Sequence, residues 1–158
     1  MKKMIAFLFA AVILLSACSG GRQFTVGDPV SNINSQYTSY ISINTLSAYK
    51  INENYFVTVD DGDTIQKLAE FSPDRTCRRI QGLDLIKNDD IQPFLNADFN
   101  KLTEELGQPH ADVGSGLYIP AYITENAELI CFELENEIVV EVIRRDLLTG
   151  EIVDRVGS

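Results

Sequence analysis

Few side chains in this sequence are suited to covalent chemistry. His110 is the only histidine, and Cys77 and Cys131 are the two cysteines that lie beyond the amino-terminal segment. A cysteine nucleophile works with a base within hydrogen-bond reach, so a small enzyme that uses Cys or His chemistry near His110 is one hypothesis. A single histidine is too few for the common histidine-rich zinc sites, and no nucleophile-elbow motif occurs. We therefore predict a protein that is not an enzyme and that uses no cofactor and no metal.

The stretch GQPHADVGSGLYIPAY surrounds His110 with glycines and tyrosines. A phosphate-binding loop places its glycines between a strand and a helix, usually with a lysine, whereas these glycines follow a predicted helix and precede a strand. Gly114 and Gly116 instead favour a bulge or a positive φ where the strand begins. Tyr118 and Tyr122 share one face of that strand by period two. We predict a binding surface formed by His110, Gly114, Gly116, Tyr118 and Tyr122. The alternative is that the tyrosines only cover the sheet edge and that His110 is a solvated loop residue.

The acidic stretch VDDGDT partly matches two known site patterns. A calcium loop needs an oxygen ligand where Ile65 stands, and no glutamate closes the loop at the required distance. The phosphatase pattern D-x-D-x-T is missed as well, because Thr64 directly follows Asp63. We interpret the stretch as a solvated acidic turn.

The amino terminus, MKKMIAFLFAAVILLSACSGG, has the layout of a secretory signal, with two lysines, an apolar run and then small residues. The apolar run is shorter than the roughly 20 residues that span a bilayer. The tetrad LSAC, which ends at Cys18, resembles the lipobox of bacterial lipoproteins, in which a diacylglycerol is attached to the cysteine and the peptide is cut before it. The resemblance implies a cleaved signal peptide at 1–17 and a membrane anchor of acyl chains on Cys18. The protein would then face the extracellular or periplasmic side.

Export also affects the expectation for the other two cysteines. Two cysteines in an exported chain commonly form a disulfide, so a Cys77–Cys131 bridge is one prediction. The alternative is a free, partly covered thiol, because alternation places Cys131 on the face opposite Ile130 and Phe132. The arginines that flank Cys77 in the run RTCRR either lower the pKa of that thiol or simply offset the acidic surface.

Length and charge limit the organisation of the protein and its partners. The chain has 158 residues and a formal net charge of −10, which fits one domain and opposes binding to nucleic acid. Downstream of the signal peptide, we predict a lipidated flexible tether over 18–36, because this segment is rich in Ser, Gly and Asn. A single domain over 37–148 and a carboxyl-terminal tail over 149–158 complete the prediction.

Strand signals dominate the first part of the predicted domain. A turn at 52–54 between the runs 48–51 and 55–59 predicts a hairpin. The segment 64–71 is read as either a short helix or a strand, and a further strand is expected at 79–80.

The clearest helix lies in NADFNKLTEELGQP. Phe99, Leu102 and Leu106 fall on one face by helical spacing. Asp98 is a suitable N-cap, because its carboxylate can accept an N–H of the first turn. Gly107 can adopt the positive φ that ends a helix, and the proline two residues later prevents continuation.

Three strands are predicted after this helix, at 116–124, 127–135 and 137–145. Short polar turns join them, so neighbouring strands should be antiparallel. The residues expected under the helix alternate along the last two strands: Ile130, Phe132, Leu134, Ile138, Val140 and Val142. The predicted fold class is α+β, with a small antiparallel sheet that includes this three-strand meander and is packed by one or two helices.

The order of helix, Leu106-Gly107-x-Pro109, aromatic-bearing strand and two further strands is similar to the repeating unit of the SmpA/OmlA (BamE-like) lipoproteins and of the β-lactamase-inhibitory-protein fold. The resemblance covers 98–145, and the segment 75–91 does not match a first unit. It implies a non-enzymatic domain that binds proteins or scaffolds envelope assemblies. The leading hypothesis is therefore a lipid-anchored envelope protein that binds another envelope protein. A small Cys/His enzyme and a purely structural lipoprotein are the alternatives.

Overall fold

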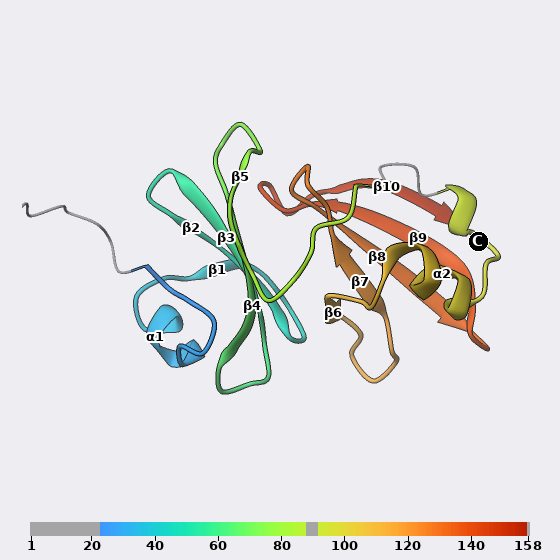
Figure 1. The fold of residues 1–158 in the computed structure, drawn as a ribbon, viewed down its shortest axis with the longest axis horizontal. Coiled ribbons are helices and arrows are strands. Elements are labelled where there is room, and N and C mark those ends of the chain that lie inside the picture. The colour runs from blue at the N-terminus through green and yellow to red at the C-terminus, as the bar shows by residue number, and fades with distance from the viewer. Residues whose placement is uncertain (1–22, 88–91, 158) are drawn as a thin grey trace, which may run out of the picture.

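The computed structural model describes residues 23–87 and 92–157. The predicted signal peptide and Cys18 lie outside these residues. Within them the chain forms two five-stranded antiparallel sheets, in the orders β1-β2-β3-β4-β5 and β10-β9-β8-β7-β6 (Figure 1). Each sheet is a meander, in which strands adjacent in sequence are adjacent in space. The predicted α+β class is wrong, because the described chain is mostly strand and its two α-helices are short.

The first half of the described chain builds the first sheet. Its elements are α1 (Val30–Asn34), β1 (Ser39–Ile43), β2 (Leu46–Ile51), β3 (Asn54–Asp60), β4 (Ile65–Phe71) and β5 (Cys77–Gln81). The predicted hairpin is confirmed, since β2 and β3 are joined by a tight turn in which Asn52 has a φ of 55°. Asparagine tolerates this left-handed conformation better than most residues. The segment 64–71, for which the sequence predicted either a short helix or a strand, forms the strand β4.

The second half repeats the same plan. Its elements are the 3-10 helix η1 (Gln92–Phe94), α2 (Phe99–Leu106), β6 (Ala111–Asp112), β7 (Pro120–Ile123), β8 (Glu128–Glu135), β9 (Ile138–Asp146) and β10 (Ile152–Gly157). The three predicted antiparallel strands are confirmed as β7, β8 and β9, except that β7 begins at Pro120 and not at the predicted residue 116. The predicted tail over 149–158 is wrong, because it contains β10, which pairs with β9 from Ile152 to Gly157.

The helix α2 forms as its sequence signals predict. The Asp98 carboxylate accepts the backbone N–H of Lys101 at 2.8 Å, and Gly107 follows the helix with a φ of 79°. Leu102 is fully buried, and Phe99 and Leu106 pack beside it against the second sheet.

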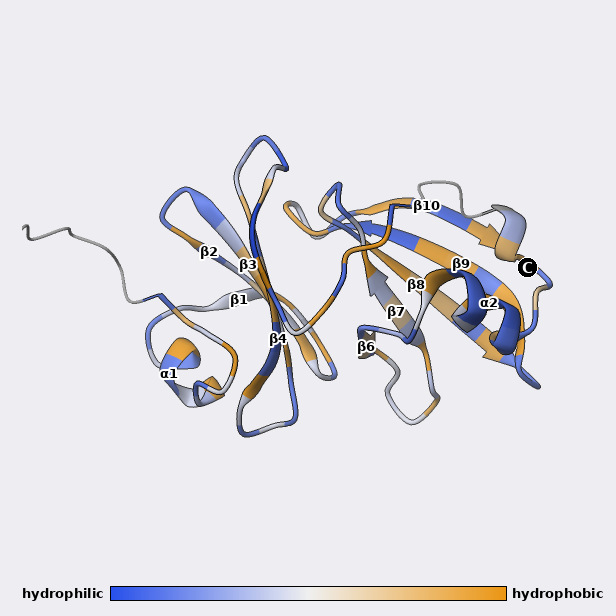
Figure 2. Cartoon of the chain, in the orientation of Figure 1, coloured by the Kyte–Doolittle hydropathy of each residue, from blue (hydrophilic) through white to orange (hydrophobic). Residues whose placement is uncertain are grey.

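The two sheets pack face to face and share one core. That inner core takes residues from both halves of the chain: Ile41, Leu46, Ala48, Val57, Val59, Ala69, Phe71, Ala111, Val113, Ala121, Ile123, Ala127, Leu129, Cys131 and Leu147. Each outer face has its own apolar cluster, covered by α1 on the first sheet and by α2 with η1 on the second (Figures 1 and 2). Central strands are therefore buried on both faces, and β3 is buried continuously from Phe56 to Val59 without alternation.

The segment predicted as a flexible tether belongs in part to the folded domain. Phe24 and Ile33 are buried in the outer cluster of the first sheet. Backbone bonds attach this segment to the sheet, with the Gly27 N–H donating to the Ile65 carbonyl at 2.8 Å. The tether prediction is therefore wrong for the described part of 18–36. Two apolar side chains at irregular spacing anchor the segment, and such spacing has no periodic signature in the sequence.

A β-bulge alters the predicted face of β9. Phe132 pairs with Val142, and both lie under α2 as expected, but the register shifts between Glu133 and Leu134. Val139 rather than Val140 is consequently buried in the cluster that α2 covers, and Ile138 is 38% exposed. One extra residue on a strand reverses the facing of those beyond it, so strict period two fails there.

Candidate functional site

The loop between β6 and β7 is compact and internally bonded. The Asp112 carboxylate accepts the backbone N–H groups of Gly114 at 2.9 Å and Ile119 at 3.0 Å. A Cβ at Gly114 would stand 1.6 Å from the carbonyl oxygen of Leu117, and Gly116 has a φ of +93°. The predicted positive φ is confirmed at Gly116, whereas Gly114 is needed for a reason that was not predicted, the close approach of the Leu117 carbonyl.

The two tyrosines of the predicted binding surface have different environments. Tyr122 is fully buried; its ring packs against Phe132 and His110, and its hydroxyl donates to the Gly107 carbonyl at 2.9 Å. Tyr118 is 48% exposed and contacts Phe99 edge to face at 5.8 Å between ring centroids. Only Tyr118 is thus available to a partner. The apolar cluster that α2 covers reaches Tyr122 in β7, whereas Tyr118 lies before β7 begins.

His110 is buried, so neither the predicted binding surface nor the solvated-loop alternative describes it. Its side chain is 6% exposed, and its Nδ1 accepts the backbone N–H of Ile123 at 2.8 Å. Burial first, and then the charge of Lys67, lower the pKa of His110 to about 4, although the backbone and carboxylate of Asp84 act in the opposite direction. The imidazole is therefore neutral at neutral pH, with its proton on Nε2. Its basic nitrogen is already engaged by the backbone.

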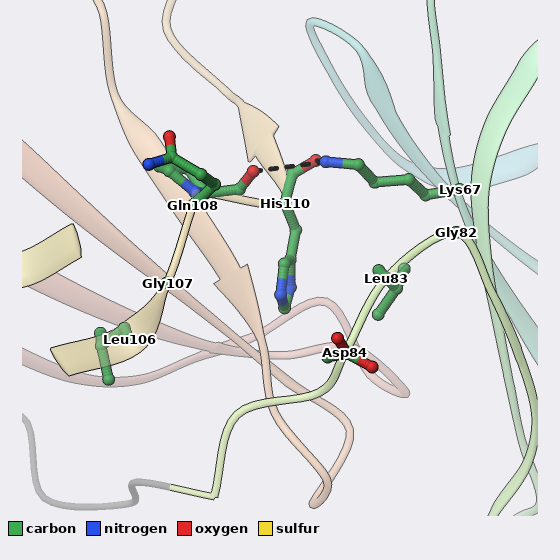
Figure 3. Close-up of a pocket in the computed structure, with 9 residues that line it drawn as sticks. Lys67, Gly82, Leu83, Asp84, Leu106, Gly107, Gln108 and His110 are labelled. Carbon is green, nitrogen blue, oxygen red and sulfur yellow. Dashed lines mark hydrogen bonds between the residues drawn. The ribbon is translucent and has the colours of Figure 1, made fainter. Parts of the chain in front are cut away.

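Lys67 reaches from β4 of the first sheet to the second sheet beside His110. Its ammonium donates to the carbonyl of Pro109 at 3.3 Å and to the carbonyl of His110 (Figure 3). Burial lowers the pKa of Lys67. An open cavity of about 390 Å³ adjoins this contact, lined by Lys67, Gly82, Leu83, Asp84 and residues 106–110. Because the Lys67 ammonium and the basic nitrogen of His110 are both bound to backbone, the arrangement joins the two sheets, and neither of these two groups is free to act as a base.

Both remaining cysteines are free thiols in the structure. Cys131 is buried in the inner core, on the face opposite Ile130 as predicted, and Cys77 packs against the same core from β5. Burial raises the pKa of Cys77 and raises that of Cys131 to about 12. The idea that flanking arginines lower the pKa of Cys77 is wrong, because burial dominates and Arg79 pairs with Glu70 at 3.5 Å.

The stretch VDDGDT is an exposed turn, as interpreted from the sequence. The Asp61 carboxylate accepts the N–H groups of Asp63 at 3.0 Å and Thr64 at 2.8 Å, and these bonds lower the pKa of Asp61. In residues 23–87 and 92–157, no group of three or more His, Cys, Asp or Glu side chains is arranged to hold a metal ion.

Sequence reasoning missed two surface features. Leu117, at the tip of the β6–β7 loop, is 77% exposed. A small groove of about 120 Å³ beside it is lined by Leu117, Tyr118, Ile119, Glu133, Leu134 and Val140. The second feature is a depression of about 410 Å³ between the sheets, lined by Thr38, Tyr40, Lys50, Tyr55, Leu148 and Thr149. The hairpin register, which places Lys50 opposite Tyr55, was a usable signal for the second feature. For the first feature, the only signal in the sequence was the apolar pair Leu117-Tyr118 directly after Gly-Ser-Gly.

Comparisons with family models, with curated proteins and with solved structures found no match. No helix among the described residues is long and apolar enough to cross a membrane.

Proposed function

We propose that this protein is a lipid-anchored cell-envelope protein whose β-rich domain binds another envelope protein through the β6–β7 loop. The anchor is proposed from the signal-like amino terminus and the LSAC tetrad at Cys18. The observation that carries the binding role is the exposure of Leu117, which is 77% accessible on an internally bonded loop.

The loop is suited to binding because its conformation is fixed beforehand. The Asp112 carboxylate and the close approach at Gly114 hold the loop, so a partner does not have to order it. Complete burial of a leucine side chain contributes about 1.5–3 kcal/mol, and a half-exposed tyrosine adjoins it. Tyrosine is also common at the centres of protein interfaces.

Charge indicates what the partner presents. Glu133 lines the groove beside Leu117 and forms no ion pair with any residue that the structure describes. The chain as a whole carries a net charge of −10. The partner is therefore proposed to be a protein segment with an apolar side chain next to a lysine or arginine, which would pair with Glu133.

Site-specific photo-crosslinking in intact cells tests this interface. A photoreactive phenylalanine analogue at Leu117 should yield one discrete protein adduct, and the analogue at Ile152 is the matched control because Ile152 is 46% exposed in β10 of the same sheet. Glu133→Lys should weaken the Leu117 adduct by opposing the basic partner. Equal adducts at both positions, or an adduct that Glu133→Lys leaves unchanged, would contradict the proposed interface. A purely structural lipoprotein would give neither effect.

The anchor has a separate test. Mass spectrometry of the mature amino-terminal peptide should find a diacylated or triacylated Cys18, and Cys18→Ser should release the protein from membranes. An unmodified amino terminus at Ser19 or later would refute the anchor and leave the interface to be judged by crosslinking alone.

A further inference from the structure

A second surface feature, separate from the β6–β7 loop, is a polar pocket between the two sheets. Three neighbouring strands of the first sheet contribute Tyr40 from β1, Lys50 from β2 and Tyr55 from β3. The turn after β9 supplies Leu148 and Thr149 from the second half of the chain. The volume of about 410 Å³ falls in the range of small-molecule sites, roughly 300–1,000 Å³.

The tyrosine rings are fixed in position. The register of β1 with β2 jumps from Ser39 opposite Tyr49 to Ile41 opposite Ala48, which leaves Tyr40 as the extra residue of a bulge. Bulges redirect side chains, and this one leaves Tyr40 39% exposed beside a buried neighbour. The Tyr40 hydroxyl donates to the Leu147 carbonyl, and its ring meets that of Tyr55 edge to face at 6.3 Å.

Lys50 brings a positive charge that the protein itself does not neutralise. Its ammonium lies 5.4 Å from the centroid of the Tyr55 ring and pairs with no carboxylate in the part of the chain that the structure describes. This is notable in a chain with 23 acidic and 13 basic side chains. Burial first, then Tyr55 and the nearby Asp146 carboxylate, raise the pKa of Tyr40. This carboxylate already pairs with Arg75 and accepts the N–H groups of residues 148 and 149.

We propose that this pocket binds an acidic saccharide. The exposed ring of Tyr40 would lie against the C–H face of the sugar, and the Lys50 ammonium would pair with its carboxylate. The hydroxyls of Thr38 and Thr149 line the same pocket and suit the hydroxyls of the sugar, since each can both donate and accept. Aromatic surface for an apolar face, hydroxyls for polar edges and one cation for one carboxylate together match this ligand class. The pocket does not depend on the proposed protein interface.

Titration of the full chain with glucuronic acid and with glucose tests the assignment. Chemical-shift changes in a ¹⁵N-labelled sample, held in a detergent that contains no sugar, should map to β1, β2 and the turn after β9. Glucuronic acid should bind more tightly than glucose, and added salt should reduce the difference. Lys50→Gln should weaken glucuronic acid binding about tenfold and leave glucose binding nearly unchanged.

Matched variants keep the result interpretable. Lys101→Gln alters an exposed lysine of α2 and should leave both affinities unchanged. Tyr40→Leu should weaken both sugars together, and far-UV circular dichroism checks that it remains folded. Equal affinities for the two sugars, full affinity for glucuronic acid in Lys50→Gln, or shifts confined to other parts of the molecule would each overturn the proposal.

Discussion

The buried state of His110 predicts a specific dependence of stability on pH. The side chain is 6% exposed, and burial together with the Lys67 charge lowers its pKa from 6.5 to about 4. His110 is the only histidine in the chain, so few other side chains titrate between about pH 5 and about pH 7. Any change in stability across that interval is therefore attributable mainly to this residue.

The sign follows from the two pKa values. Between the folded pKa of about 4 and the unfolded value of 6.5, the unfolded chain binds a proton at His110 that the folded chain does not bind. The free energy of unfolding therefore rises with pH across this window and is lost on acidification. Applying about 1.36 kcal/mol per pKa unit, we expect a loss of about 2 kcal/mol between about pH 7 and about pH 5, and about 3 kcal/mol in total at lower pH.

Urea unfolding followed by far-UV circular dichroism measures this loss. His110→Gln should reduce stability near pH 7, because the Ile123 N–H loses its imidazole acceptor, but it should remove most of the slope between about pH 5 and about pH 7. The single imidazole Cε1–H resonance also reports the pKa directly. A resonance that titrates near 6.5, or a slope that His110→Gln preserves, would refute the reasoning.

Three further predictions concern stability and the thiols. Asp98→Ala should lower the free energy of unfolding by about 1 kcal/mol in urea titrations, since it removes the N-cap of α2, and Glu104→Ala on the exposed face of α2 should change little. Tyr122→Phe should cost about 1 kcal/mol by the same assay, because a buried hydroxyl bond to backbone is lost; a neutral effect would contradict that bond. Thiol titration without reductant should count Cys77 and Cys131 as free in denaturant, and Cys131 should react far more slowly in the native protein. If neither thiol reacts in denaturant, the two cysteines instead form a disulfide.

Local signals in the sequence were sufficient for local structure. The N-cap Asp98, the apolar face of α2 and the glycine stop are all interactions within one short segment, and all are confirmed. The hairpin of β2 and β3 and the order β7-β8-β9 followed from short turns in the same way. The positive φ at Gly116 was predicted for the same reason, because it is a local backbone geometry.

Tertiary packing decided the fold class and the character of the site. Two sheets share one core, and this pairing joins residues far apart in the chain, so β4, which is buried at four successive positions, lost the alternation that would have distinguished it from a helix. Tyr122 and His110 belong to the interior because α2 and the neighbouring strands enclose them, whereas Tyr118 and Leu117 stay exposed beyond that cover. The sequence by itself determined the two ends of α2 and the tight turns between neighbouring strands, since capping and turn formation act between near neighbours. Only the folded chain determined which side chains face solvent, because burial depends on what the rest of the molecule places against each face.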